Sequence, residues 1–252
     1  MTHPIRIIDT GLRPARWNVA MTAALAELHE KAEIPDTIRF HRYPRCVLLG
    51  RSQNAGRAAN LPHCRSEGID IARRVTGGGA VFMSPQVLAW DVVVDQAATG
   101  AANLQGITHH IGEGIAAGLS RLGVTARFRA PNDVEIGGRK VSGSSGYAGR
   151  RSAVLQGTVL LTDEIAAMAR ALRLPALSLR SSITCLAEAY GFVPLLSEVM
   201  GSVICGLTET LDREAAAQPL SAREAACCEA LLQQEIGTDA FVFGMPDTGA
   251  AA

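Results

Sequence analysis

The sequence predicts an α+β domain in which mixed β-sheets are flanked by helices. Three observations support this fold class: an opening strand and helix, a series of short β-rich runs with few helices between them, and a final third rich in Ala and Leu. This order favours α+β over a regular βαβ repeat. With 252 residues and 48% hydrophobic content, the chain is long enough for one large core.

The first part of the chain is predicted to contain one long helix and several strands. Residues 5–9 read as a strand. Apolar residues then recur at helical spacing between residues 15 and 32, which predicts a helix over this range. Val, Ile, Leu and Trp then cluster in short runs between Gly, Pro and Asn breaks, which is typical of strands. These runs span residues 37–42, 46–50, 70–75 and 88–94.

The middle of the chain contains a second predicted helix and a second β-rich block. Apolar residues recur at helical spacing over residues 103–122, and Gly123 stands where a helix is expected to end. The block that follows covers residues 124–161. Within it, Gly137 and Gly138 lie between two β-rich runs, as the two-residue turn of a hairpin does.

The last part of the chain is predicted to be helical and to stay within the same domain. We expect a catalytic domain over residues 1–217 and a C-terminal helical extension over residues 218–252, which ends in a frayed tail. Neither an internal repeat nor a low-complexity linker separates them. The helical candidates are residues 168–172, 194–217 and 222–235.

Charge and composition exclude several classes of protein. Lys plus Arg and Asp plus Glu both number 24, so no global field recruits nucleic acid or a membrane. The N-terminus lacks a secretory signal and no apolar stretch is long enough to span a bilayer, so we expect a cytoplasmic protein. The six cysteines are scattered without a CxxC pair, which indicates free structural thiols.

A glycine triplet beside two arginines is the first candidate binding element. In the segment RRVTGGGAVF, a strand carrying Arg73 and Arg74 runs into Gly77, Gly78 and Gly79 and then into another strand. Glycines allow a ligand to approach the backbone closely, and their N–H groups can hold an anion. The planar guanidinium of the adjoining arginine suits a phosphate or carboxylate. A flexible hairpin loop is the alternative.

A lysine on the predicted hairpin is the second candidate. Lys140 follows the Gly137-Gly138 turn and precedes small residues, so its ammonium can be aimed at a nearby site and stabilise charge developing on a carboxylate or phosphate oxygen. Asp133 is a candidate ligand for a divalent cation bound with nucleotide phosphates. A solvated Arg-Lys pair is the alternative.

Four segments in this order and spacing resemble the lipoate-protein ligase branch of the biotin/lipoate ligase and octanoyltransferase family. They are RRVTGGGAVF, PND, GRKVSGSSGY and LQGTVLL, within a matching region of about residues 39–161. GRSQN at residues 50–54 and RSSIT at residues 180–184 also resemble family stretches. The resemblance implies the catalytic fold of the class II synthetase-like biotin/lipoate ligases.

What the resemblance implies for function is an ATP- and Mg²⁺-dependent ligation in two steps. Lipoate attacks the α-phosphate of ATP to give lipoyl-AMP, and a lysine of a carrier then displaces AMP. Lys140 takes the catalytic position, and Asp133 the position nearest the metal. The implied substrate- and nucleotide-binding residues are Arg51, Arg74, Thr76, Gly77, Gly78, Gly79, Ala80, Asn132, Asp133, Ser142, Gly143, Ser144, Gly157 and Thr158.

The implied acceptor is a small lipoyl carrier, either an H-protein-like protein or the lipoyl domain of a dehydrogenase E2 component. Ligases of this type often carry an accessory domain after the catalytic one, and little chain remains here for it. A separate accessory subunit is therefore a further expected partner.

The sequence also departs from the common ligase pattern. Met83 stands where many members have a histidine, and Leu155-Gln156 replaces a histidine pair before the Gly-Thr dipeptide. His41 and Trp17 lie near matched segments, but the sequence gives only proximity, so neither is included in the predicted site.

Three alternatives remain open. A lipoyl or octanoyl transferase acts without ATP through a cysteine thioester. One transferase branch places that cysteine in the stretch matching residues 125–131, which contains none here. A non-catalytic lipoate-binding partner subunit is the second alternative. A biotin ligase is the third, although the glycine- and arginine-rich loop of biotin ligases is missing.

Overall fold

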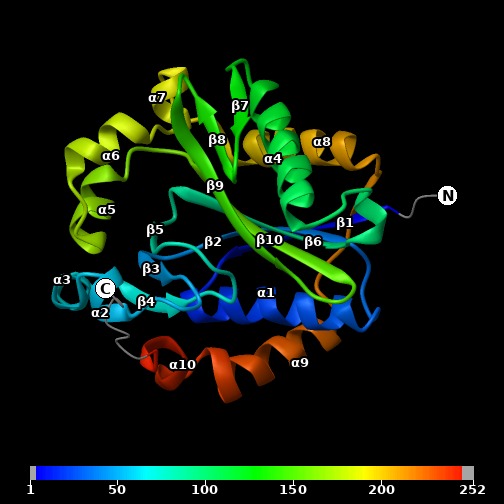
Figure 1. Ribbon diagram of the computed structural model, residues 1–252, viewed down its shortest axis with the longest axis horizontal. Helices are drawn as coiled ribbons and strands as arrows, with labels where there is room; N and C mark the ends of the chain where they lie inside the picture. Colours follow the sequence, from blue (N-terminus) through cyan, green and yellow to red (C-terminus); the bar gives the residue numbers. More distant parts are fainter. Residues whose placement is uncertain (1–3, 246–252) are drawn as a thin grey trace.

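The structure, a computed structural model that describes residues 4–245, is built on an eight-stranded mixed sheet (Figure 1). Its strands follow the order β11-β1-β2-β6-β10-β9-β8-β7. β1 pairs in parallel with β2 and β11, and the other neighbours are antiparallel. The bounds are β1 Ile5–Leu12, β2 Thr37–Arg42, β6 Val87–Asp95, β7 Ala126–Arg129, β8 Asp133–Ile136, β9 Arg139–Ala148, β10 Ser152–Leu160 and β11 Ala215–Ala217.

A second sheet of three short strands faces one side of the large sheet. It has the order β4-β3-β5, with β3 at Cys46–Leu49, β4 at Asp70–Arg73 and β5 at Val81–Met83. Because β4 and β5 lie on opposite edges of β3, the chain between them must cross the end of β3. That crossing segment is residues 74–80, which contains the glycine triplet.

Helices cover both faces of the large sheet. α4 (Leu104–Ser120) and α8 (Leu196–Leu211) pack together on one face, while α1 (Ala15–Glu30) lies on the other with α9 (Ala222–Leu231) outside it (Figure 1). The α4–α8 contact is close because glycines meet there: a Cβ on Gly206 would lie 2.2 Å from the carbonyl oxygen of Gly114. The shorter helices are α2 Ala55–Ala58, α3 Leu61–Ser66, α5 Ile165–Leu172, α6 Ala176–Ser182, α7 Leu186–Tyr190 and α10 Asp239–Phe243, with a 3-10 turn at Ala97–Thr99 and a π-helical turn at Leu232–Ile236.

The hydrophobic core has two parts, one on each face of the large sheet. One part joins the sheet to α4 and α8. The other joins it to α1, the small sheet and the C-terminal helices. The functional cavity described below lies on the second side, between the two sheets.

Most of the predicted elements are confirmed, including the α+β class with mixed sheets. The strand at residues 37–42 matches β2, and both glycines of the predicted hairpin turn have positive φ, 59° for Gly137 and 76° for Gly138, as a type I′ turn requires. The strand predicted at residues 5–9 continues to Leu12.

One predicted helix is partly wrong. Residues 194–217 were expected to be helical throughout, but α8 ends at Leu211 and is followed by Asp212 in the left-handed region, with φ 52°. Ala215–Ala217 then forms β11 beside β1. Alanine favours a helix, but the parallel pairing with the edge of the sheet outweighs that preference. The frayed tail expected at the C-terminus lies outside the described residues.

A search of residues 4–245 for a helix both long and apolar enough to traverse a bilayer found none.

Candidate active site

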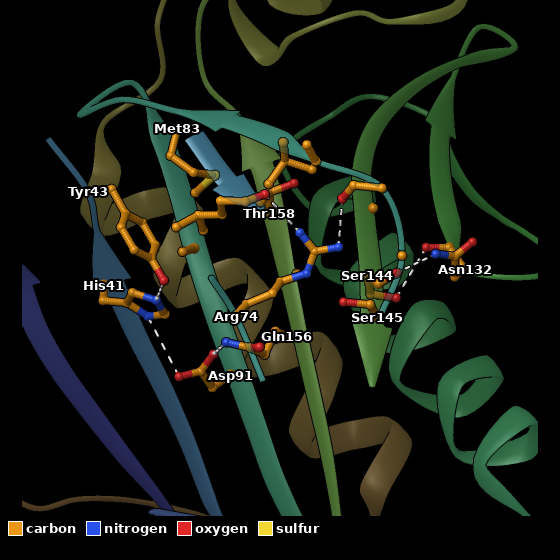
Figure 2. Close-up of a pocket in the computed structure, with 18 of the residues that line it drawn as sticks. His41, Tyr43, Arg74, Met83, Asp91, Asn132, Ser144, Ser145, Gln156 and Thr158 are labelled. Carbon is orange, nitrogen blue, oxygen red and sulfur yellow. Dashed lines mark hydrogen bonds and ion pairs between the residues drawn. The ribbon is translucent and has the colours of Figure 1, made fainter. Parts of the chain in front are cut away.

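A cavity of about 280 Å³ lies between the two sheets. Its walls come from β2, β6, β9 and β10 of the large sheet, from β3 and β5 of the small sheet, and from the glycine-rich crossing segment. Figure 2 shows its two ends: His41, Tyr43 and Met83 gather at one, and Asn132 and Ser144 lie at the other.

The strand register gives this cavity a direction and a length. His41 of β2 pairs with Ala89 of β6, Ala89 with Thr158 of β10, and Thr158 with Gly143 of β9. All four residues line the cavity, so it forms a trough that runs across the strands. Three strand intervals of about 4.8 Å each make it roughly 14 Å from the His41 strand to the Gly143 strand. Small residues in the middle of the row leave room for an extended ligand.

Lys140 occupies the β9 end of this trough. Its Nζ lies 2.6 Å from Oδ1 of Asp133, whose other oxygen accepts a hydrogen bond from Arg129 at 2.7 Å. The lysine crosses directly over Gly143, because a Cβ on that residue would lie 2.4 Å from Nζ. Glycine at position 143 therefore allows the ammonium to lie across the backbone at this end of the trough.

The glycine-rich crossing segment is shaped by Arg74. This side chain is 6% exposed and donates hydrogen bonds to the carbonyl oxygens of Leu48 (3.2 Å), Gly77 (2.7 Å) and Gly79 (2.8 Å). Burial lowers the pKa of its guanidinium to about 10, so it remains charged near neutral pH. Gly78, the residue between the two bonded glycines, has φ +92°, a conformation that favours glycine.

We expect Arg74→Ala to loosen this segment, because hydrogen bonds from a charged donor contribute about 1.5–3 kcal/mol each. Hydrogen exchange should show at least tenfold faster exchange at residues 77–80. Arg74→Lys should not restore protection, since an ammonium cannot reproduce the planar fork of a guanidinium. Arg65→Ala, an exposed position on α3, is the control. Unchanged exchange in Arg74→Ala would contradict this role.

A buried polar network forms one side of the trough. Arg39 and Asp91 are both fully buried and form an ion pair at 3.1 Å. Thr22 donates to Asp91 at 2.9 Å, and the side-chain amide of Gln156 donates to the other carboxylate oxygen at 3.2 Å. Thr76 in turn donates to Gln156 at 3.0 Å. Burial raises the pKa of Asp91, and the Arg39 guanidinium opposes that shift.

His41 and Tyr43 close the far end of the trough. Nε2 of His41 lies 3.2 Å from the Tyr43 hydroxyl, and the rings meet edge to face with centroids 5.1 Å apart. Burial and the neighbouring Arg39 guanidinium hold the pKa of His41 well below its usual range, so the ring is neutral at pH 7. Burial raises the pKa of Tyr43, so the phenol keeps its proton.

A second cavity, of about 180 Å³, adjoins the trough at Lys140. It shares six lining residues with the trough and then extends beneath α5 and α6; the shared residues are Ala80, Val81, Met83, Lys140, Gly143 and Thr158. Its additional walls are almost entirely apolar and comprise Phe82, Val87, Val141, Leu160, Met168, Leu172, Leu174, Leu179 and Ile183, with Ser142 as the polar exception. Lys140 therefore stands between two cavities of different character.

The structure brings most of the predicted site residues together, but not all of them. Arg51 is exposed and lines neither cavity; its backbone N–H donates to the Thr76 carbonyl at 3.0 Å. Thr76 is buried behind the trough, and Gly77 lies outside the two linings. Ser142 lines only the second cavity. Those that line the trough are Arg74, Gly78, Gly79, Ala80, Asn132, Lys140, Gly143, Ser144, Gly157 and Thr158. Asn132 holds Ser144, whose backbone N–H donates to the Asn132 carbonyl at 3.0 Å.

The sequence interpretation missed the far end of the trough. His41 was left out of the site but lines it, together with Tyr43, Asp91, Ser145 and Gln156. A signal was available, because alternation along residues 37–42 and 88–94 places His41 on the same face as Arg39, and Ala89 on the same face as Asp91. What the sequence did not reveal is how the strands align.

No group of three or more His, Cys, Asp and Glu residues able to hold a metal ion occurs among residues 4–245. Asp133, the predicted metal ligand, is engaged by two cations, Lys140 and Arg129. A single carboxylate of this kind fits Mg²⁺ only when phosphate oxygens supply further ligands. The six cysteines are free thiols, as expected.

Comparisons with known proteins agree on one family. The family described as the lipoyl protein ligase A/B catalytic domain matches residues 14–208. The octanoyltransferase LipM of Symbiobacterium thermophilum is 29% identical over 266 residues, covering 93% of this chain and 96% of the relative. Lipoate-protein ligase A subunit 1 of Thermoplasma acidophilum is 24% identical over 246 residues, covering 91% of this chain and 92% of the relative.

Solved structures share the whole fold. A bi-partite lipoate protein ligase from Thermoplasma acidophilum, described with its E2 lipoyl domain, has a TM-score of 0.86 at 22% identity and covers 99% of both chains. A lipoate-protein ligase A bound with ATP has a TM-score of 0.85 at 21% identity, covering 98% of this chain and all of that one. These matches confirm the expected ligase-type catalytic fold. Because the family match spans more than half of its length, the chain belongs to the lipoyl protein ligase A/B catalytic domain family.

Proposed function

We propose that this protein is an ATP-dependent lipoate-protein ligase. The observation that carries the proposal is the position of Lys140 between two cavities, a trough of acyl-chain length and a second apolar cavity. An enzyme that joins a carboxylic acid to a nucleotide needs two such spaces that meet at one cation. The relatives named lipoate-protein ligase, and the matching fold of a ligase bound with ATP, support the same activity.

In the first step, a carboxylate oxygen of lipoate attacks the α-phosphorus of ATP. The bond from that phosphorus to the bridging oxygen of the β-phosphate breaks, and pyrophosphate leaves with the electron pair. The product is the mixed anhydride lipoyl-AMP. In the second step, the neutral amine of a carrier lysine attacks the acyl carbon, AMP departs, and the amine nitrogen loses a proton to give the amide.

The site residues are assigned from their places around the junction of the cavities. Lys140 is placed to stabilise negative charge on the acyl carboxylate and the α-phosphate in both steps. The backbone N–H groups of Gly78 and Gly79 are suited to phosphate oxygens. The acyl chain takes the trough along Thr158, and the adenosine takes the second cavity beside Ser142.

Mg²⁺ enters this scheme as the counter-ion of the nucleotide. Asp133 is the carboxylate nearest Lys140 and is the residue that would hold the ion beside the phosphates. The ion would neutralise part of the charge that gathers on the leaving pyrophosphate.

The acceptor we propose is the exposed lysine of a small lipoyl carrier, either an E2 lipoyl domain or an H-protein-like protein. The matching ligase described with its E2 lipoyl domain supports this class of partner. A separate accessory subunit is a further proposed partner, because one relative is named as a subunit and is matched over nearly its whole length.

We also propose that residues 1–217 and the C-terminal extension form a single domain. α9 packs against α1, and Arg73 donates hydrogen bonds to the carbonyl oxygens of Val242 in α10 and Gly50 beside the glycine-rich segment. The extension thereby supports the crossing segment from behind.

Acyl transfer without ATP is the second candidate, because several relatives are named octanoyltransferases. That chemistry requires a thiolate in the site. No cysteine of the described chain lines the trough or the second cavity. Burial raises the pKa of the Cys46, Cys64 and Cys185 thiols, which opposes thiolate formation. These observations favour the adenylate route.

The decisive experiment incubates the purified protein with lipoate, Mg²⁺-ATP and a lipoyl-domain acceptor, and follows pyrophosphate release and the acceptor's mass. We expect both pyrophosphate and a lipoyl mass shift. A shift that appears only when lipoyl-AMP is supplied would assign adenylation to a separate subunit. Acylation from an octanoylated carrier in the absence of ATP would overturn the proposal in favour of a transferase.

A further inference from the structure

The far end of the trough has a distinctive chemical character. Its wall consists of the imidazole of His41, the phenol ring of Tyr43 and the thioether of Met83, which we call the distal wall (Figure 2). Tyr43 is 2% exposed and Met83 is 1% exposed. Aromatic rings and a thioether are polarisable groups that make favourable contacts with sulfur.

The distal wall is held in place before any ligand arrives. Tyr43 packs edge to face against His41, and its hydroxyl lies 3.2 Å from Nε2 of the imidazole. The strand pairing of His41 with Ala89 fixes the backbone of His41 beside the floor of the trough. Binding of a ligand against this wall therefore costs little conformational entropy, because the side chains are already ordered.

The length of the trough determines which part of an acyl chain reaches this wall. Lys140 fixes the carboxyl end at β9, three strand intervals or roughly 14 Å from β2. Seven carbon–carbon bonds of about 1.5 Å limit an extended eight-carbon chain to about 10 Å. The His41 and Lys140 side chains occupy part of the remaining length, so the last carbons of an eight-carbon acid reach the distal wall.

Two eight-carbon acids differ at that end. Lipoate carries a dithiolane ring with two sulfur atoms, and octanoate ends in a methyl group. Contacts between sulfur and an aromatic ring strengthen binding beyond ordinary packing, by roughly two- to twelvefold in Kd. An aromatic wall therefore distinguishes the two acids in the direction of the sulfur-bearing one.

We propose that the distal wall makes the site selective for an acyl group that ends in sulfur, lipoate over octanoate, with Tyr43 as the specificity-determining residue. This inference rests on the proposed function, because it places the acyl chain in the trough. It goes beyond that function by naming the residue that decides between two acids of equal chain length.

The test is to measure the Kd of both acids by calorimetry, and the kcat/KM of both for pyrophosphate release, in the wild type and in three variants. Tyr43→Leu removes the ring together with its hydroxyl, and Tyr43→Phe keeps the ring and removes only the hydroxyl. Met83→Leu removes the thioether at similar volume. The ratio of the two acids within each variant is the readout, so a general loss of folded protein does not alter it.

We expect the wild type to bind lipoate about five- to tenfold more tightly than octanoate. Tyr43→Leu should reduce that ratio to near one, Tyr43→Phe should keep it, and Met83→Leu should reduce it by less than Tyr43→Leu. Equal binding of the two acids by the wild type, or an unchanged ratio in Tyr43→Leu, would overturn the inference while leaving the ligase proposal intact. If neither acid binds the wild type, the proposed function itself fails.

Discussion

Lys140→Ala is expected to lower the rate of lipoyl-adenylate formation and of transfer to the carrier by about 10²–10³-fold, the loss seen when one group that stabilises transition-state charge is removed. The fold should persist, because this side chain is 36% exposed and replacements at such positions change stability little. Asp133 keeps Arg129 as its partner in the variant. Pyrophosphate release and transfer from supplied lipoyl-AMP measure the two steps separately.

The chain offers a matched control for this experiment. Lysine occurs only at positions 31 and 140 of the sequence. Lys31 is the C-cap residue of α1, with its ammonium 2.5 Å from Glu27 and its side chain 50% exposed. Lys31→Ala should therefore leave both rates within twofold of the wild type. Full activity of Lys140→Ala, or an equal loss in the two variants, would refute the role given to Lys140.

Arg39→Met is expected to lower the free energy of unfolding by about 3–5 kcal/mol, because removing one partner of a buried ion pair leaves an uncompensated charge. Arg39 and Asp91 have fully buried side chains. The guanidinium also donates to Oδ1 of Asn18 at 2.7 Å. Urea unfolding followed by circular dichroism measures the change.

The loss of unfolding free energy in Arg39→Met should depend on pH in a defined direction. Burial already raises the pKa of Asp91, and Arg39 opposes the shift, so the variant should have a still higher native pKa. A carboxyl group whose pKa is raised by folding destabilises the native state. The penalty is complete above the native pKa, shrinks as pH falls below it, and is absent below the unfolded pKa. The unfolding free energy of the variant should therefore fall further below that of the wild type at pH 8 than at pH 5.

The double variant Arg39→Met with Asp91→Asn separates charge from packing. It removes both charges together, which is often close to neutral for stability, so it should recover most of the loss and show little pH dependence. A deficit of the same size in the single and double variants, at both pH values, would contradict the ion-pair explanation.

Local patterns in the sequence were sufficient for most elements of the fold. The period of residues 103–122 predicted α4, and the two glycines at 137 and 138 predicted the β8–β9 hairpin. β11 was missed because its alanines carry no strand signal of their own. It forms through pairing with Ile5–Ile7, a contact between distant parts of the chain that no local window contains.

Local sequence patterns likewise predicted one end of the site, whereas the other end depends on contacts between distant parts of the chain. The end of the trough around Lys140 was predicted because glycines, an amide and a lysine stand close together in sequence. The opposite end depends on how β2, β6 and β10 align, which brings His41 into line with Thr158 through Ala89. Arg74 was expected to bind an anion directly. In the structure its guanidinium lines the trough and also donates hydrogen bonds to three backbone carbonyl oxygens of the protein.

The scarcity of lysine has a consequence for an enzyme that holds an acyl-adenylate. Such an intermediate acylates neutral amines within reach. Guanidinium groups stay protonated and do not compete as nucleophiles, and nearly every side-chain cation of this protein except the histidines is an arginine. Lys140, the lysine at the site, is paired with Asp133 at 2.6 Å. In the proposed adenylate route, this composition would leave few amines of the protein itself to react, so the amine of the carrier would meet little competition.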